Sequence, residues 1–245
     1  MNHWHFPAGF FDVLTVVTYI VFFYFIALQL VLFSLLFLSY RDMRRRLAQN
    51  FYTDYEAVAK SHFTFPVSVL LSAHNEEKSV IGAVRSVLSL DYPEFELIVI
   101  NDGSTDSTLA ILASEFQLVR KDSIVRRSIQ DAGVIRATYA SATVPNLLVI
   151  DKEHGGKSEA LNAGINLSRY PLFCTIDADA MFQDNALLRA VRPFLEDPDR
   201  VIAVGGQVRV VNGCRVVRGR VVEPRLPQSI LAAFQVVEYL RAFVG

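Results

Sequence analysis

The sequence has few cysteines and no excess of positive charge. Cys174 and Cys214 are the only cysteines among its 245 residues. They cannot form a framework of disulfide bonds, so we expect both as reduced thiols in a cytosolic compartment. The formal net charge is −1, and a chain without an overall basic field does not collect the phosphates of a nucleic acid. Nucleic acid is therefore not expected as a partner.

The composition is too apolar for an ordinary soluble domain. Hydrophobic residues make up 52% of the chain and the mean hydropathy is +0.30, yet 20% of the residues are charged. This combination predicts a membrane segment joined to a globular domain.

Residues 13–40 contain no charged side chain, and this run exceeds the ~20 residues that a helix needs to cross a bilayer. A cleaved signal peptide does not fit, because no lysine or arginine precedes the run. Four arginines follow it, and such a basic flank stays in the cytoplasm: Arg41, Arg44, Arg45 and Arg46. We therefore expect an extracytoplasmic N-terminus (1–12), a transmembrane helix (13–40) in the cell membrane, and a cytoplasmic juxtamembrane linker or helix (41–64).

From residue 65 onward, short apolar runs alternate with stretches of helical periodicity. Strands are predicted at 67–71, 97–100, 147–150 and 172–176, with a further strand-like run at 201–211, and helices at 77–90, 104–115, 157–167 and 186–195. Strands rich in Val, Ile and Leu that alternate with helices predict a parallel sheet covered on both faces. We expect an α/β domain over 65–225 whose ligands gather at the carboxyl ends of the strands.

Two carboxylates follow the fourth predicted strand. Asp177 and Asp179 are separated by one residue, and the two-residue period of an extended chain places them on the same side of the backbone. Such a pair suits a hard divalent cation that carries a diphosphate. The alternative is a solvated turn after a strand.

Three more polar clusters follow predicted strands, at residues 74–77, 101–104 and 154–158. The first can bond a ribose or base, or cap a helix. In the second, Asp102 can accept hydrogen bonds from a base or sugar, or the cluster is a turn with an N-cap. In the third, Gly155, Gly156 and Lys157 offer backbone N–H groups and a positive charge to a diphosphate, or they only begin a helix.

The last part of the sequence is basic and then amphipathic. Residues 209–225 contain five arginines and only one acidic residue, Glu223. These arginines form a solvated or headgroup-facing strip, or they contact an acceptor or diphosphate. Apolar residues then recur at helical spacing, which predicts an amphipathic helix within 226–245. This helix could lie on the membrane surface or pack on another part of a longer protein.

The four clusters together resemble the family 2 glycosyltransferases, in particular the membrane-anchored, processive branch with hyaluronan, chitin, cellulose and poly-N-acetylglucosamine synthases. The resemblance rests on residues 69–77, 99–106, 155–164 and 175–179. It implies the nucleotide-sugar-binding α/β fold called GT-A, and a UDP-sugar as donor.

The resemblance also implies roles for single residues. Asp102 would contact the uracil, and Lys157 would lie near the phosphates. Asp179 would bind Mg²⁺ or Mn²⁺ directly, with Asp177 close to the ribose or the metal. The nucleoside pocket would be lined by Ala73, Asn75 and Glu76.

Two motifs of the family are absent from the sequence. No acidic ED-type motif for the general base and no Gln-x-x-Arg-Trp motif for the acceptor follows Asp179, and the only tryptophan is Trp4. We therefore expect the donor half of an inverting transferase that acts on a glycan acceptor, with its base beyond Gly245 and a C-terminal half or another subunit as partner. The alternative is a membrane module that binds nucleotide sugar or a partner without catalysis.

Overall fold

The computed structural model describes residues 10–51, 64–122, 129–217 and 219–244. Its helices are α1 (Phe10–Phe51), α3 (Val80–Leu88), α4 (Thr108–Phe116), α5 (Lys157–Leu167), α6 (Ala186–Glu196) and α7 (Ile230–Val244). Its strands are β1 (Val67–Ala73), β2 (Phe95–Asp102), β3 (Leu118–Arg120), β4 (Ile135–Ser141), β5 (Leu147–Lys152), β6 (Leu172–Asp177), β7 (Arg215–Val217) and β8 (Arg220–Glu223). The four strands and four helices expected between residues 65 and 196 are all present.

Helix α1 contains the predicted membrane segment. The stretch Asp12–Asp42 contains an 18-residue window with a mean hydropathy of 2.6, and it is long and apolar enough to cross a membrane, by its length and composition. The hydroxyls of Thr18 and Ser34 donate hydrogen bonds to carbonyl oxygens of the preceding turn, each at 2.8 Å, so these two groups are satisfied within the helix. The helix continues through residues 41–51, so this part of the expected linker is helical; residues 1–9 and 52–63 lie outside the described residues.

The globular part is built on a sheet with the strand order β3-β4-β5-β2-β1-β6. Strand β1 pairs in parallel with β2 and β6, and β2 pairs in parallel with β5. After β1 the chain forms β2 on one side of β1, and later it forms β6 on the other side of β1. The strand order therefore reverses at β1, and ligands of such sheets bind beside the carboxyl ends of the strands at this point.

One edge of the sheet is antiparallel. Strand β4 runs against β5, and β3 runs against β4. Strand β4 lies in the connection 121–146, for which the sequence predicts no element. A parallel sheet with an antiparallel edge is a common arrangement.

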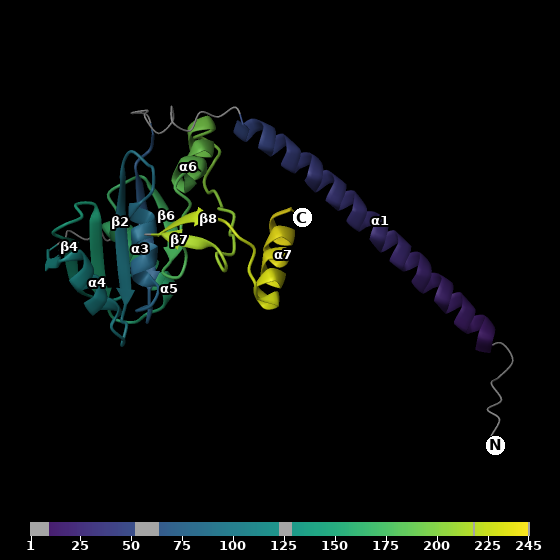
Figure 1. Cartoon of the computed structure of the whole chain (residues 1–245), viewed down its shortest axis with the longest axis horizontal. Coiled ribbons are helices and arrows are strands. Elements are labelled where there is room, and N and C mark those ends of the chain that lie inside the picture. The colour runs from purple at the N-terminus through teal and green to yellow at the C-terminus, as the bar shows by residue number, and fades with distance from the viewer. Residues whose placement is uncertain (1–9, 52–63, 123–128, 218, 245) are drawn as a thin grey trace, which may run out of the picture. The chain divides into compact units, whose positions relative to one another are not determined.

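Helices cover both faces of the sheet, as predicted. Alternate strand residues point to opposite faces: Leu71 and Val99 belong to a core that includes residues of α3, α4 and α6, whereas Leu70 and Ile100 pack with α5. All four are 0% exposed. Figure 1 shows α3 beside β2, with its axis running roughly along the strand. Two packed faces hold the carboxyl ends of β1, β2 and β6 in fixed positions.

The prediction of a strand at 201–211 is wrong. These residues form no strand, and the side chain of Ile202 is 94% exposed. The strands of this region are instead β7 and β8, a short antiparallel pair. An apolar run without a partner strand cannot make ladder hydrogen bonds, and Gly205 and Gly206 weaken an extended conformation further.

The two cysteines and the C-terminal helix complete the fold. Both cysteines are free, and burial raises the pKa of the Cys174 thiol to about 11, which keeps it protonated at neutral pH. Helix α7 begins at Ile230, inside the amphipathic stretch predicted for 226–245, and its residues Leu231 and Phe234 are exposed.

Candidate functional site

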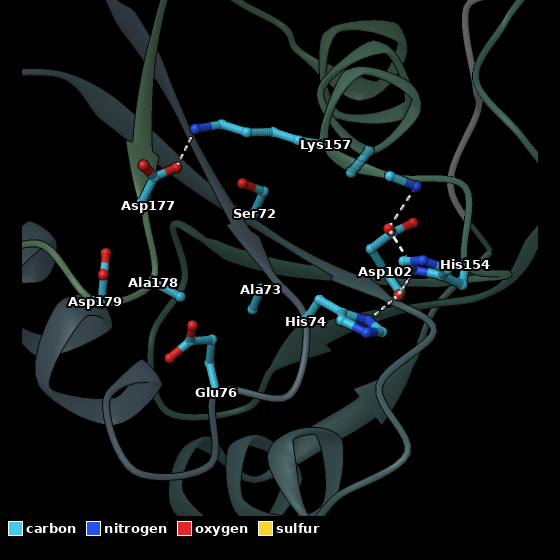
Figure 2. Close-up of a pocket in the computed structure, with 12 residues that line it drawn as sticks. Ser72, Ala73, His74, Glu76, Asp102, His154, Lys157, Asp177, Ala178 and Asp179 are labelled. Carbon is cyan, nitrogen blue, oxygen red and sulfur yellow. Dashed lines mark hydrogen bonds and ion pairs between the residues drawn. The ribbon is translucent and has the colours of Figure 1, made fainter.

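A cavity of about 340 Å³ lies at the carboxyl ends of β1, β2 and β6 and beside the first turn of α5. It is lined by Ser72, Ala73, His74, Glu76, Asp102, His154, Gly156, Lys157, Ala160, Asp177, Ala178 and Asp179. Figure 2 shows two groups of polar side chains in it: Asp177 and Asp179 on one side, and Asp102 with His74 and His154 on the other. We refer to these as the carboxylate end and the histidine end.

The carboxylate end follows strand β6. Asp177 is the last residue of the strand, Ala178 is buried at 2% exposure, and the N–H of Ala180 donates to the carbonyl oxygen of Asp177 at 3.1 Å. This tight turn buries Ala178 and leaves the side chains of Asp177 and Asp179 exposed in the cavity. Carboxylate oxygens with access to solvent form the donor set that Mg²⁺ and Mn²⁺ prefer. The residues present therefore fit a hard divalent cation.

Lys157, the first residue of α5, reaches this end of the cavity. Its Nζ lies 2.5 Å from Oδ1 of Asp177, and the two side chains are 60% and 54% exposed. The preceding Gly156 has φ +88°, a conformation that favours glycine, and the carbonyl oxygen of Gly156 accepts the first hydrogen bond of the helix from Ala160. A cationic side chain and a helix N-terminus thus face the same space.

The histidine end is organised by Asp102, whose carboxylate is 4% exposed. Its Oδ1 accepts hydrogen bonds from Lys152 Nζ at 2.7 Å and from the N–H of Gly155 at 3.1 Å. Its Oδ2 accepts from the N–H of Gly156 at 2.8 Å and lies 3.0 Å from Nδ1 of His154. Both oxygens are therefore bound by the protein itself.

These partners keep Asp102 ionised. Burial acts to raise its pKa, but the hydrogen bonds from Lys152, Gly155 and Gly156 and the charge of Lys152 together lower the pKa below its usual value. Lys152 is 0% exposed and stands opposite Asp102 in the β2–β5 register. The carboxylate thus ties β2, β5 and the turn before α5 together. A contact from Asp102 to a base, as the resemblance implies, would have to share oxygens that already have donors.

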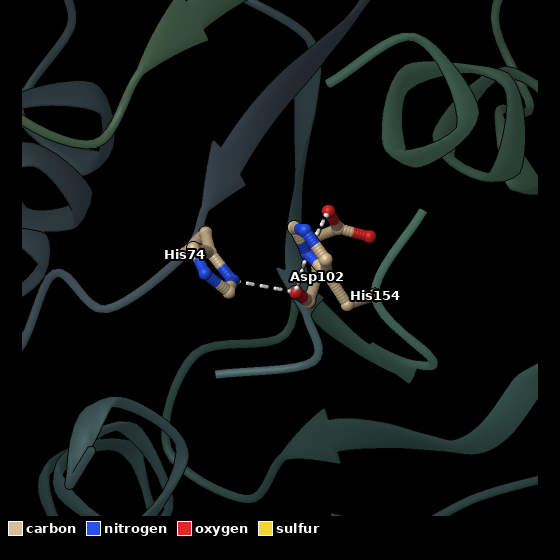
Figure 3. A group of neighbouring side chains, drawn as sticks. All are labelled: His74, Asp102 and His154. Atoms are coloured by element: carbon tan, nitrogen blue, oxygen red, sulfur yellow. Dashed lines mark hydrogen bonds and ion pairs between the residues drawn. The ribbon is translucent and has the colours of Figure 1, made fainter. Parts of the chain in front are cut away.

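His74 and His154 lie next to each other beside Asp102 (Figure 3). Their Nδ1 atoms are 2.8 and 3.1 Å from the carbonyl oxygen of Asp102, and their ring centroids are 4.2 Å apart. Gly103 must be glycine here, because it has φ +62° and an added Cβ would lie 2.5 Å from the backbone nitrogen of His154. The close packing of Gly103 against the backbone of His154 holds the two imidazole rings near each other.

The hydrogen bonds of Asn75 define the tautomer of His74. Oδ1 of Asn75 accepts from the N–H of Thr105 at 2.8 Å, so its Nδ2 is the atom that faces Nε2 of His74 at 3.3 Å. A donor at this position requires Nε2 to be an acceptor, which places the proton of the neutral ring on Nδ1. Nδ1 then donates to the carbonyl oxygen of Asp102.

The histidine end could also be considered as a metal centre. His74, Asp102 and His154 offer one ligand atom each within 4.8 Å of one another. Their polar atoms, however, already have partners in the protein: the carboxylate oxygens bind Lys152 and two backbone N–H groups, and His74 donates to a carbonyl oxygen. The more exposed carboxylate end is the better fit for a cation.

The structure brings most of the predicted site residues together. Ala73, Glu76, Asp102, Lys157, Asp177 and Asp179 line the cavity. Asn75 is absent from the lining, and its side chain bonds the 105–106 loop instead. His74 and His154 belong to the polar clusters predicted at 74–77 and 154–158, but sequence reasoning assigned neither of them an individual role, and it assigned none to Ser72. Their positions directly after or near strand ends are the signal that could have singled them out.

Comparison with known proteins shows which protein family this chain resembles. Residues 68–235, more than half of the chain, match the model of Glycosyl transferase family 2. The poly-beta-1,6-N-acetyl-D-glucosamine synthase of Staphylococcus epidermidis is 30% identical over 174 residues, which are 71% of this chain and 32% of the synthase. The synthase of the same name from Staphylococcus aureus (strain COL) is 26% identical over 173 residues, with the same shares. The chain thus spans about a third of the length of these relatives.

Solved structures are similar at lower identity. TarS of S. aureus in complex with UDP-GlcNAc is 22% identical with a TM-score of 0.40, over 54% of this chain and 32% of that one. The mannosyltransferase PcManGT from Pyrobaculum calidifontis, in complex with GDP-Man and Mn²⁺, is 21% identical with a TM-score of 0.45, over 69% of this chain and 42% of that one. The family match over residues 68–235 agrees with the resemblance carried by the four strand-end clusters, and the chain belongs to glycosyl transferase family 2.

Proposed function

We propose that this chain is the donor-binding part of a membrane-bound, inverting glycosyltransferase that moves an N-acetylglucosamine-like sugar from a UDP-sugar to a glycan acceptor. The observation that carries the proposal is the cavity at the strand ends, where a carboxylate pair and Lys157 stand opposite a preformed histidine end. The choice of sugar is supported by the two relatives, which are named poly-beta-1,6-N-acetyl-D-glucosamine synthase.

Asp179 and Asp177 would hold Mg²⁺ or Mn²⁺. When bound, the cation supplies positive charge next to the diphosphate, which stabilises the negative charge that builds on the departing UDP. Lys157 adds a second positive charge at the same end, because its Nζ already reaches Asp177. Charge stabilisation of the leaving group is thereby concentrated at the end of β6.

The nucleoside would occupy the rest of the cavity. Ala73 is buried at 2% exposure and provides an apolar surface, while Glu76 and Asp102 lie on the lining with their carboxylates. Because the Asp102 carboxylate is fixed by three protein donors, its side chain contributes a rigid shape and a negative potential without any rearrangement on binding. Asn75 would act indirectly here, by holding the tautomer of His74.

We also propose that α1 anchors the protein in the cell membrane with residues 1–12 outside and the α/β domain in the cytoplasm. The support is the length and composition of Asp12–Asp42 and the arginines that follow the apolar run. In this arrangement the lipid bilayer is a partner, and the donor site is on the side where nucleotide sugars are made.

A second candidate function is a membrane module that binds nucleotide sugar or a partner subunit without catalysis. It is favoured by the histidine end of the cavity, where the Asp102 carboxylate is already bound by Lys152, Gly155 and Gly156 and so offers a binding surface rather than a reactive group. Release of UDP from UDP-N-acetylglucosamine by the purified full chain, in the presence of an oligosaccharide acceptor, would distinguish a transferase from a binding module.

The donor site itself is tested by calorimetric titration of the detergent-solubilised chain with UDP, with and without Mn²⁺. We expect binding that is stronger with Mn²⁺ and that loses this dependence in Asp179→Ala. Asp199→Ala is a matched control, because Asp199 is exposed and does not line the cavity. Metal-dependent binding that survives Asp179→Ala unchanged would refute the role of Asp179.

A further inference from the structure

The loop that follows the carboxylate pair is held by a buried serine of α3. Ser86 is 0% exposed. Its Oγ accepts a hydrogen bond from the N–H of Phe182 at 2.8 Å and donates to the carbonyl oxygen of the same residue at 3.2 Å. Both backbone polar groups of Phe182 are thus bound by one side chain, three residues after Asp179.

This bonding is unusual for a serine within a helix. A helical serine commonly bonds a carbonyl oxygen of its own preceding turn, as Ser89 does at the end of α3, where its Oγ donates to Ser86 O at 2.8 Å. Ser86 instead uses its hydroxyl entirely on another segment of the chain. Because α3 is packed on the sheet through Val80, Val84 and Val87, each 0% exposed, Phe182 is attached to a rigid element.

Other contacts at the same place reinforce the attachment. The N–H of Asp91 donates to the carbonyl oxygen of Asp184 at 2.9 Å. The guanidinium of Arg220, on β8, donates to the carbonyl oxygen of Ser89 at 2.5 Å and lies 3.5 Å from Oδ1 of Asp184. The loop between Asp179 and α6 is therefore fixed at Phe182 and Asp184, and the β7–β8 pair is joined to it.

Asp179 itself has no comparable support. It is exposed, and its position depends on the turn at Asp177–Ala180 on one side and on Phe182 on the other. Three residues span at most about 11 Å of extended chain, so a shift of Phe182 would be passed on to Asp179.

We propose that Ser86 is a positioning residue for the metal-binding carboxylate Asp179. The role rests on the proposed function, since it needs a cation at Asp179. Ser86 touches neither cation nor nucleotide; it acts through Phe182. Residues that orient metal ligands in this indirect way commonly change metal affinity when they are replaced.

The test compares Ser86→Ala with Ser89→Ala in the full chain in detergent micelles. Each change removes one serine hydroxyl, Ser86 from within α3 and Ser89 from the position just after its last residue, but only the hydroxyl of Ser86 bonds the loop. Mn²⁺ affinity is measured at saturating UDP from the electron paramagnetic resonance signal of free Mn²⁺. UDP affinity is measured by calorimetry in EDTA, and thermal unfolding is followed for each variant.

We expect Ser86→Ala to weaken Mn²⁺ binding by on the order of tenfold, while its metal-free UDP affinity stays unchanged and Ser89→Ala resembles the wild type. Equal Mn²⁺ affinity in both variants would overturn the role of Ser86. So would a loss of Mn²⁺ and UDP binding together, which indicates general loss of structure. A wild-type chain that binds no Mn²⁺ in the presence of UDP would instead refute the proposed function.

Discussion

Replacement of Lys152 by methionine tests whether Asp102 organises the histidine end of the cavity. Lys152 is 0% exposed, and its Nζ donates to Asp102 Oδ1 at 2.7 Å and to the carbonyl oxygen of Glu153 at 2.5 Å. Methionine keeps most of the buried side-chain volume but removes the charge and both hydrogen bonds that Lys152 Nζ donates. The substitution therefore isolates the polar contribution of Lys152 from its packing.

The expected loss of stability follows from the partners that remain. Breaking a buried ion pair from one side costs about 3–5 kcal/mol, because it leaves an uncompensated charge. Asp102 keeps the N–H groups of Gly155 and Gly156 as donors, so we expect the lower end, about 3 kcal/mol in the free energy of unfolding. For a domain of this size that loss corresponds to roughly 6–12 °C in the melting temperature.

Thermal unfolding of the full chain in detergent, followed by circular dichroism, measures the effect. Lys78→Met is the control, because Lys78 is exposed and its replacement should change stability by less than about 0.5 kcal/mol. A double-mutant cycle with Asp102→Asn should give a coupling energy of at least about 1.5 kcal/mol. Effects of Lys152→Met and Asp102→Asn that add to within about 0.5 kcal/mol would refute the coupling.

The ion pair between Lys152 and Asp102 also predicts that the stability of the folded chain depends on pH. The folded-state pKa of Asp102 is lowered, so its ionised form stabilises the folded chain at every pH above the usual aspartate value of about 3.9. That contribution is lost as the pH falls through the lowered folded-state pKa. In Lys152→Met the stability difference from wild type should accordingly shrink below about pH 4, and a difference that stays unchanged below that pH would contradict the assignment.

Two further predictions concern the carboxylate end of the cavity and the amino end of the central strand β2. Lys157→Met should strengthen Mn²⁺ binding without nucleotide by about two- to fivefold, because Lys157 and a cation compete for Asp177 in an exposed pair. The same variant should weaken UDP binding with Mn²⁺ by about tenfold through loss of a charge-assisted contact; calorimetry measures both, and changes of the same sign would contradict the competition. Glu96→Gln should lower the free energy of unfolding by about 2 kcal/mol, because the buried carboxylate of Glu96 accepts hydrogen bonds from Ser68 Oγ at 2.6 Å and from Arg169 N and Nε at 2.7 Å. Denaturant titration tests this, and UDP affinity should stay unchanged since Glu96 lies at the amino end of β2.

The sequence predicts the sheet well because its parallel strands are buried on both faces. Runs such as Leu97–Ile100 have no polar alternation, which is the pattern of a covered parallel strand. The same reasoning fails at Val201–Val211, where β-branched residues occur without a partner strand. Strand propensity describes a fit to a half-buried pleated surface, and local sequence does not reveal whether that surface exists.

The sequence predicts where the site lies, but it predicts only some of the contacts that its residues make. Polar residues at the ends of β1, β2 and β6 meet because parallel strands end at the same edge. The partners of Asp102 could not be predicted, since Lys152 stands opposite it only through the β2–β5 register. Asn75 is displaced from the lining by a tertiary contact to Thr105, and no local pattern signals that contact.

The two ends of the cavity differ in how much of their hydrogen bonding is already satisfied. At the histidine end, the Asp102 carboxylate has three protein donors and His74 has partners on both ring nitrogens, so little rearrangement remains to be made on binding. At the carboxylate end, Asp177 is paired with the exposed ammonium group of Lys157, and Asp179 is exposed. A preformed surface lowers the entropy cost of holding a ligand, whereas exposed carboxylates repel a diphosphate until a cation is present. The nucleoside part of a donor would therefore be held by shape, and its diphosphate part would depend on the metal, which is why Ser86 and Lys157 should affect metal and nucleotide affinity differently.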